Sequence, residues 1–103
     1  MDRIAQLQRF LEARPDDPFP RYALALEQRS RGDLTTAAGT LEDLVRRAPD
    51  YVPAYLMLGQ LLQQLDRPAD ARAQLAAGQQ QARSKGDGHA LSELTSALEA
   101  LGS

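Results

Sequence analysis

The stretch AYLMLGQLLQQLDRPADA, residues 54–71, decides the fold predicted for this chain. An aromatic residue at Tyr55 is followed by the pair Leu58-Gly59, and the run breaks at residues 66–68 with Asp-Arg-Pro. The apolar residues before the break recur at steps of three and four, which is typical of an amphipathic helix. Because proline is tolerated in the first turn of a helix, a second helix begins at this break. The stretch therefore predicts two helices folded back on each other, with the small residue Ala71 at their contact.

Much of this pattern occurs a second time, further upstream. The matching pairs are Leu24 and Leu58, Ala25 and Gly59, Ala37 and Ala71, and Leu41 and Leu75. Every pair has the same separation, that from position 24 to position 58, and we call this separation the repeat period. Self-similarity at one fixed period of this size indicates a repeat architecture, in which each helical hairpin buries its apolar face against its neighbours. The sequence therefore predicts a stacked array of helix-turn-helix units.

The N-terminal residues follow the same period. Leu7 lies one repeat period before Leu41, Leu11 before Val45, and Pro15 before Pro49. Residues 2–14 also show the apolar spacing of an amphipathic helix. We interpret this helix as the second half of a unit whose first half is missing.

Start and stop signals divide the chain into six predicted helices. Asp17-Pro18 combines a capping side chain with a first-turn proline, and Gly32-Asp33 combines a left-handed helix end with a new N-cap. Gly86-Asp87 repeats the second signal. The predicted helices span about residues 2–14, 18–31, 34–48, 51–65, 68–84 and 87–101. No segment alternates with period two, so no strand is expected.

Composition limits the classes of function. The 103 residues suit a single domain, and 14 acidic against 12 basic residues give a net charge of −2, which disfavours binding to nucleic acid or an anionic membrane. The absence of cysteine excludes thiol catalysis, disulfides and the usual zinc sites. We expect no signal peptide and no membrane span, and hence a cytoplasmic location.

No constellation of side chains indicates catalysis. His89 is the single histidine and adjoins the start of the last predicted helix, where we expect it to be solvated or to cap that helix. The carboxylate pairs Asp16-Asp17 and Glu42-Asp43 are interpreted as a helix cap and an exposed face. We therefore predict a protein that is not an enzyme and that has no cofactor and no metal site.

Several of these residues together resemble the tetratricopeptide repeat. The resemblance is carried by residues 54–55, 58–59, 71 and 75 in one copy and by residues 24–25, 32, 37, 41 and 49 in the other. It implies an all-α fold of antiparallel helix-turn-helix repeats stacked as a short right-handed superhelix. The implied division of the domain 1–103 is an N-terminal half-repeat helix 2–14, repeats 18–51 and 52–85, and a capping helix 87–101. The chain departs from the family pattern at Arg21, at Asp66-Arg67 in place of a turn glycine, and at Arg83.

The resemblance also implies a site. First helices of such units line a concave groove that receives a segment of a partner protein. Carried over by register, the groove positions are Phe19, Tyr22, Leu26, Arg29, Ser30, Pro53, Leu56, Gln60, Gln63 and Gln64. An alternative interpretation is that Phe19 and Tyr22 cover the N-terminal helix, and that Arg29 and the glutamines are solvated helix formers.

Two hypotheses about the partner follow from these residues. Some related domains bind a partner's C-terminal carboxylates with lysine, arginine and asparagine side chains. The matching positions here are Tyr22, Leu26, Leu56 and Gln60, so an apolar or amphipathic protein segment is favoured. The first hypothesis is an adaptor or scaffold that captures such a segment. The second is an assembly subunit that forms a homo-oligomer through the strip of Phe19, Tyr22 and Leu26.

Overall fold

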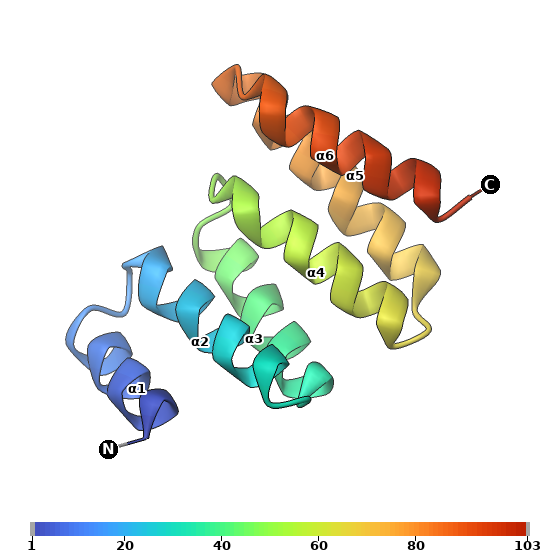
Figure 1. The fold of residues 1–103 in the computed structure, drawn as a ribbon. Coiled ribbons are helices and arrows are strands. Elements are labelled where there is room, and N and C mark those ends of the chain that lie inside the picture. The colour runs from blue at the N-terminus through green and yellow to red at the C-terminus, as the bar shows by residue number, and fades with distance from the viewer. Residues whose placement is uncertain (1, 103) are drawn as a thin grey trace.

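The computed structural model describes residues 2–102, which form six helices and no strand (Figure 1). The helices are α1 (Arg3–Ala13), α2 (Pro18–Ser30), α3 (Leu34–Arg47), α4 (Val52–Gln64), α5 (Pro68–Lys85) and α6 (Gly88–Ala100). Each bound lies within one residue of the predicted one, a difference that is usual at helix ends. The predicted all-α fold is confirmed.

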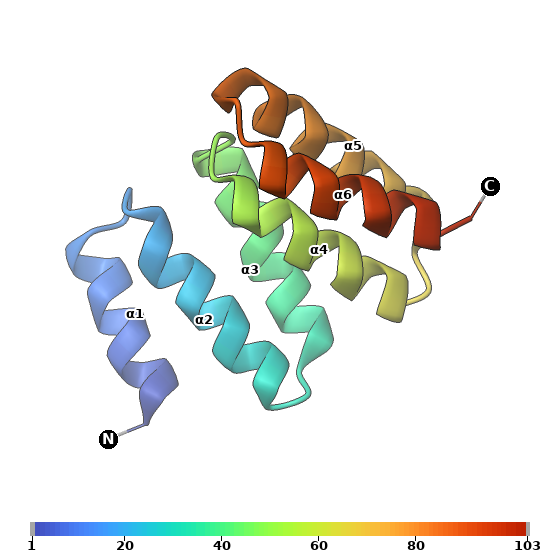
Figure 2. The same cartoon turned by 45° about the horizontal axis from the view of Figure 1, so that its top comes forward.

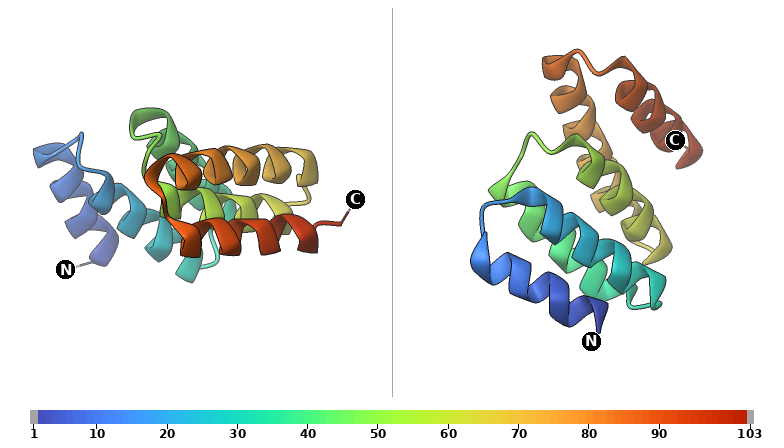
Figure 3. Two further views of the ribbon diagram at one scale, coloured as in Figure 1. Left: turned by 90° about the horizontal axis from the view of Figure 1, so that it is seen from above. Right: turned by 60° about the vertical axis from the view of Figure 1, so that its left-hand side comes forward.

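The helices pack in chain order as a row. Each helix contacts the next, and α4 also contacts α6, so that these two lie side by side with α5 behind them (Figure 2). The array is elongated, 43 × 29 × 19 Å, and the two ends of the chain lie at its opposite ends (Figures 1 and 3). This arrangement is the one that stacked helical hairpins adopt.

Three turns between helices share one hydrogen-bond pattern. At the first, the amide of Gly32 donates to the carbonyl of Arg29 at 2.9 Å, and the amide of Asp33 donates to the carbonyl of Gln28 at 3.0 Å. The turns centred on Asp66 and Gly86 repeat both bonds at the same offsets. All three central residues have positive φ, at 82°, 60° and 67°. This pattern ends a helix with a left-handed residue and satisfies its last carbonyls.

Side-chain caps start three of the helices as the sequence predicts. Asp17 accepts from the amide of Phe19, Asp33 from that of Thr36, and Asp87 from that of Ala90. Each carboxylate satisfies an amide that has no partner within its helix. The predicted caps are therefore confirmed.

The core is a pair of clusters joined along α4. The larger lies between α2, α3 and α4, and the smaller between α4, α5 and α6. Leu58 and Leu75, which the repeat pattern singled out, are buried in them. Gly59 allows close approach of α5, since a Cβ at this position would lie 2.5 Å from Leu75 Cγ.

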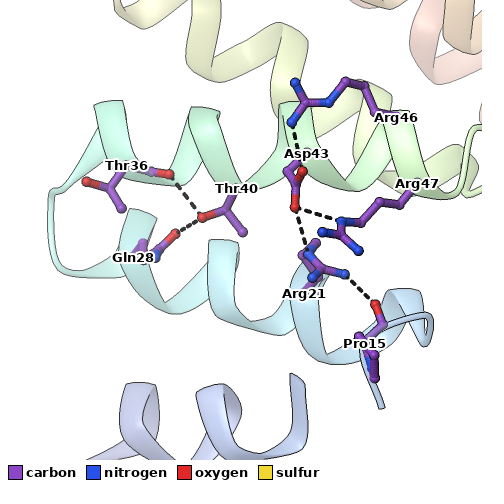
Figure 4. Close-up of polar contacts among 8 residues, drawn as sticks. All are labelled: Pro15, Arg21, Gln28, Thr36, Thr40, Asp43, Arg46 and Arg47. Carbon is purple, nitrogen blue, oxygen red and sulfur yellow. Dashed lines mark hydrogen bonds and ion pairs between the residues drawn. The ribbon is translucent and has the colours of Figure 1, made fainter. Parts of the chain in front are cut away.

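Polar contacts fix α2 against α3 (Figure 4). The Arg21 guanidinium lies 3.3 Å from the Asp43 carboxylate and also donates to the Pro15 carbonyl at 2.9 Å. The hydroxyl of Thr40 lies 2.7 Å from the amide oxygen of Gln28, a buried polar residue. A buried polar group that has its partner avoids a desolvation penalty, so these contacts position α2 without cost to the core.

Candidate functional site

The first helices of successive hairpins, α2, α4 and α6, together line a trough. One cavity joins Tyr22, Pro53 and Leu56 to α6, a second joins Leu56 and Gln60 to α6, and a third joins Gln60 to α2. Because adjacent cavities share Leu56 and Gln60, they form one continuous surface over α4. We call this surface the central trough; its residues are Tyr22, Arg29, Pro53, Leu56, Gln60, Gln63, Gln64, His89 and Glu93.

At one end of the trough, the wall formed by α2 and α4 is apolar, and the α6 side carries ionisable residues. There Tyr22, Val52, Pro53 and Leu56 line a cavity of about 350 Å³. The rings of Tyr22 and Tyr51 pack at a centroid distance of 5.4 Å and an interplanar angle of 59°, a tilted arrangement that aromatic pairs favour. Burial raises the pKa of the Tyr51 phenol, with smaller contributions from Tyr22 and Asp17. Tyr22, packed on Tyr51, therefore contributes to the apolar wall at this end.

The other end of the trough is polar. Gln60, Gln63 and Gln64 of α4 and Arg29 of α2 line a cavity of about 540 Å³ with Leu34. The three glutamines and Arg29 are exposed. A glutamine amide both donates and accepts, and can therefore pair with either type of peptide backbone group.

Helix α6 contributes residues that the sequence analysis did not assign to the groove. His89 and Glu93 lie one turn apart on α6, with 3.3 Å between His89 Nε2 and a Glu93 carboxylate oxygen. Both line the two cavities of the trough that reach α6. The expectation that His89 is solvated is confirmed, since 87% of its side chain is exposed. The interpretation of residues 87–101 as a cap did not anticipate that α6 lies beside α4 and lines the trough.

The trough cavities contain most of the predicted groove residues, but Phe19, Leu26 and Ser30 do not line them. Leu26 is 37% exposed and lies on α2 one turn from both Tyr22 and Arg29, beside the trough. Phe19 instead lines a different cavity, between α1 and α2, together with Phe10. The alternative interpretation of Phe19 as a residue beside the N-terminal helix thus agrees with its position, whereas Tyr22 packs on Tyr51.

Neither a metal centre nor a membrane span is visible in the described residues. Residues 2–102 contain no cluster of three or more His, Asp or Glu side chains placed to hold a metal ion. No helix within them combines the length and the apolar character needed to cross a bilayer. What the trough offers is an apolar wall beside a row of amides.

The period, the stacking and the trough define a helical-repeat protein. Residues 28–94 match the family model described as tetratricopeptide repeat, and the chain belongs to this family. Its members are generally protein-interaction modules and typically non-catalytic. Among curated proteins, none matches the chain.

Solved structures of bacterial proteins are similar to this chain over most of its length. A tetratricopeptide repeat domain protein from Salinibacter ruber, solved as a crystal structure, is 42% identical, with a TM-score of 0.79 over 82% of this chain and 94% of that one. The solution structure of the Salinibacter ruber protein gives 42% identity and a TM-score of 0.80, over 84% of this chain and 88% of that one. A protein from Bordetella parapertussis is 26% identical, with a TM-score of 0.81 over 98% of this chain and 88% of that one.

Proposed function

We propose that this chain is an adaptor that binds a segment of a partner protein in the central trough. The observation that carries the proposal is the continuity of the trough across α2, α4 and α6, with an apolar end and an amide end. An elongated surface of this kind accommodates a segment several residues long. A cytoplasmic location and a scaffold role remain predictions from the sequence.

The chemistry of the trough favours an amphipathic segment. An apolar side chain of the partner fits against Tyr22 and Leu56, where packing removes water from both surfaces. The backbone or polar side chains of the same segment then pair with Gln60 and Gln63. Arg29 adds a cation at this polar end, so an acidic residue near the end of the segment would strengthen binding.

Self-association is the competing proposal. The predicted strip of Phe19, Tyr22 and Leu26 is divided in the structure, because Phe19 lines a separate cavity with α1. A homo-oligomer built on the trough would use Tyr22 and Leu26 without Phe19. Light scattering over a dilution series separates the two proposals, since only self-association makes the mass depend on concentration.

The test is a selection of peptides on the immobilised chain, followed by binding measurements on the peptides recovered. We expect Leu26→Asp and Gln60→Ala each to weaken binding about fivefold to thirtyfold, the loss typical of a contact residue. The matched control is Ala76→Asp, which adds the same charge at an exposed position of α5. Peptides that bind the Gln60→Ala variant, in the trough, and the Leu26→Asp variant, beside it, as tightly as the parent chain would refute the proposal.

A further inference from the structure

The groove between α1 and α2 is an apolar surface outside the central trough. Its cavity is about 590 Å³. We call it the N-terminal groove; its lining residues are Arg3, Leu7, Phe10, Ala13, Arg14, Asp17, Phe19 and Pro20. Phe10 is 56% exposed and Phe19 63% exposed. Exposed aromatic side chains gathered at one cavity mark a contact surface.

The internal repeat shows what covers the equivalent surface one unit later. Shifted by one repeat period, the lining positions become Ala37, Leu41, Leu44, Arg47, Ala48, Tyr51, Pro53 and Ala54. All of these except Arg47 and Pro53 belong to the larger core cluster or pack against it. Leu44, the equivalent of Phe10, is completely buried in the cluster that Tyr22 and Ala25 of α2 help to form. The N-terminal groove therefore corresponds to a surface that elsewhere lies under a helix.

The next unit identifies the covering element as the first helix of a hairpin. Leu75 and Gly78 of α5 lie two repeat periods after Leu7 and Phe10. Helix α4 covers both of them: a Cβ on Gly59 would lie 2.5 Å from Leu75 Cγ, and a Cβ on Gly78 would lie 2.6 Å from Tyr55 Cβ. Helix α1 has no such helix before it among the described residues, so the element that fits its open side is helical.

The helix that fits the open side of α1 differs from a copy of α2 in the charge it places opposite Arg9. In the α2–α3 pair, Arg21 lies 3.3 Å from Asp43. The residue one repeat period before Asp43 is Arg9, which is exposed on α1. A helix resembling α2 would place an arginine opposite this arginine, and like charges at that distance repel. The matching helix carries a carboxylate there instead.

Helix α6 of a second copy is a poor match for this groove. Helix α6 is the last helix of the described residues 2–102, and its exposed residues are polar or small. They are Gly88, His89, Ser92, Glu93, Ser96, Glu99 and Ala100. Such a face has no apolar stripe to place against the exposed ring of Phe10. We propose that the N-terminal groove docks an amphipathic helix of another protein, with an aliphatic stripe over the exposed ring of Phe10 and an acidic residue facing Arg9.

The proposal is tested with two peptides that copy residues 17–31, one natural and one carrying Arg21→Glu. Amide chemical shifts of the labelled full chain report binding to α1. We expect the Arg21→Glu peptide to bind about threefold to tenfold tighter, since an attractive pair replaces a repulsive one at a partly exposed site. In the Arg9→Glu chain this preference reverses. Phe10→Ser weakens both peptides, whereas Leu26→Asp, beside the central trough, leaves them unchanged.

A second measurement removes the dependence on peptide folding, because short isolated helices are marginal in water. Residues 18–36 are repeated directly ahead of Arg3, which keeps the repeat period, with the copied Arg21 either retained or changed to Glu. We expect the Glu form to have the higher urea midpoint and slower amide exchange in α1, and Arg9→Glu to reverse the order. Equal midpoints in both backgrounds, or unchanged exchange in α1, would overturn the proposal.

Discussion

At residue 66 the chain places an aspartate where two other turns have glycine. Asp66 has φ of 60°, close to Gly86 at 67°, and its turn makes the same two hydrogen bonds. A side chain in the left-handed region costs roughly 1 kcal/mol, somewhat less for Asp than for most residues. Asp66 therefore departs from the family pattern in residue type but keeps the geometry of the turn, and its backbone is strained.

Asp66→Gly is expected to leave stability unchanged or to raise the free energy of unfolding by up to about 1 kcal/mol, because relief of strain exceeds the added entropy of the unfolded chain. Gly32→Ala, one repeat period earlier, is expected to lower it by about 1 kcal/mol for the converse reason. Urea unfolding of both variants measures the difference. Destabilisation by Asp66→Gly would contradict the strain.

Asp43 makes stability depend on pH. Arg46 lowers the pKa of this carboxyl most, burial opposes the shift, and Arg47 and Arg21 lower it further. A folded pKa below the unfolded one means that the contribution is present above the unfolded pKa of about 3.9 and is lost as pH falls through the folded value.

Asp43→Asn is accordingly expected to lower the free energy of unfolding at pH 7 by at most about 1 kcal/mol, since the carboxylate is partly exposed and screened. The difference from the parent chain should vanish once the pH lies below the lowered folded pKa of Asp43, where the carboxyl is protonated in both states. Thermal unfolding at a series of pH values measures this. Asp16→Asn is the matched control, at an exposed residue in the loop before α2. A deficit that persists in acid would mean that the Asp43 contribution is not ionic.

At the scale of the helix, α5 depends on small residues along one side. Its buried residues are Ala71, Leu75, Gly78 and Ala82. Gly78 lies between Tyr55 of α4 and Leu94 of α6. Two neighbouring helices thus approach α5 closely at one point, which joins the second hairpin to the last helix.

Gly78→Ala is expected to destabilise the chain by about 1–3 kcal/mol, the cost of overpacking a well-filled core. Gly39→Ala provides the opposite case, because Gly39 lies within α3 with nothing within 4 Å of its added Cβ. That variant should gain about 0.5–1 kcal/mol from helix propensity. Chemical denaturation of the pair separates packing from propensity. Stabilisation by Gly78→Ala would contradict the close approach of α4 and α6 to α5 at this residue.

At the scale of the whole molecule, the array is linear and its two end helices have neighbours on one side. Within the described chain, Leu7 is the buried residue of α1 and Leu94 that of α6, whereas α4 buries eight residues. In a stacked array stability comes from contacts between neighbours, so the ends open most easily.

Amide hydrogen exchange is expected to be fastest in α1, slower in α6 and slowest in α4. Helix α6 is better held than α1 because several partly buried residues, among them Leu91 and Leu98, pack on the smaller cluster. Exchange measured by NMR at neutral pH tests the order. Uniform protection along the six helices would show instead that the array opens as one unit.

The sequence by itself determined the helices, their turns and their order of packing. The repeat period identified the matching small and apolar positions of successive units. Caps such as Asp33 are local interactions between residues close in the chain. Leu58 and Leu75 were identified as core positions for the same reason. Local rules and one period therefore sufficed for the fold.

The tertiary structure alone decided which exposed residues share a surface. Phe19 and Tyr22 are one turn apart on α2, yet Phe19 lies beside α1 and Tyr22 faces Tyr51 and the trough. His89 joins Leu56 in one cavity although the two are far apart in sequence. Helical periodicity states which residues lie on one side of a helix, but the neighbours that cover that side depend on how the hairpins stack. The edges of the candidate site follow from that stacking.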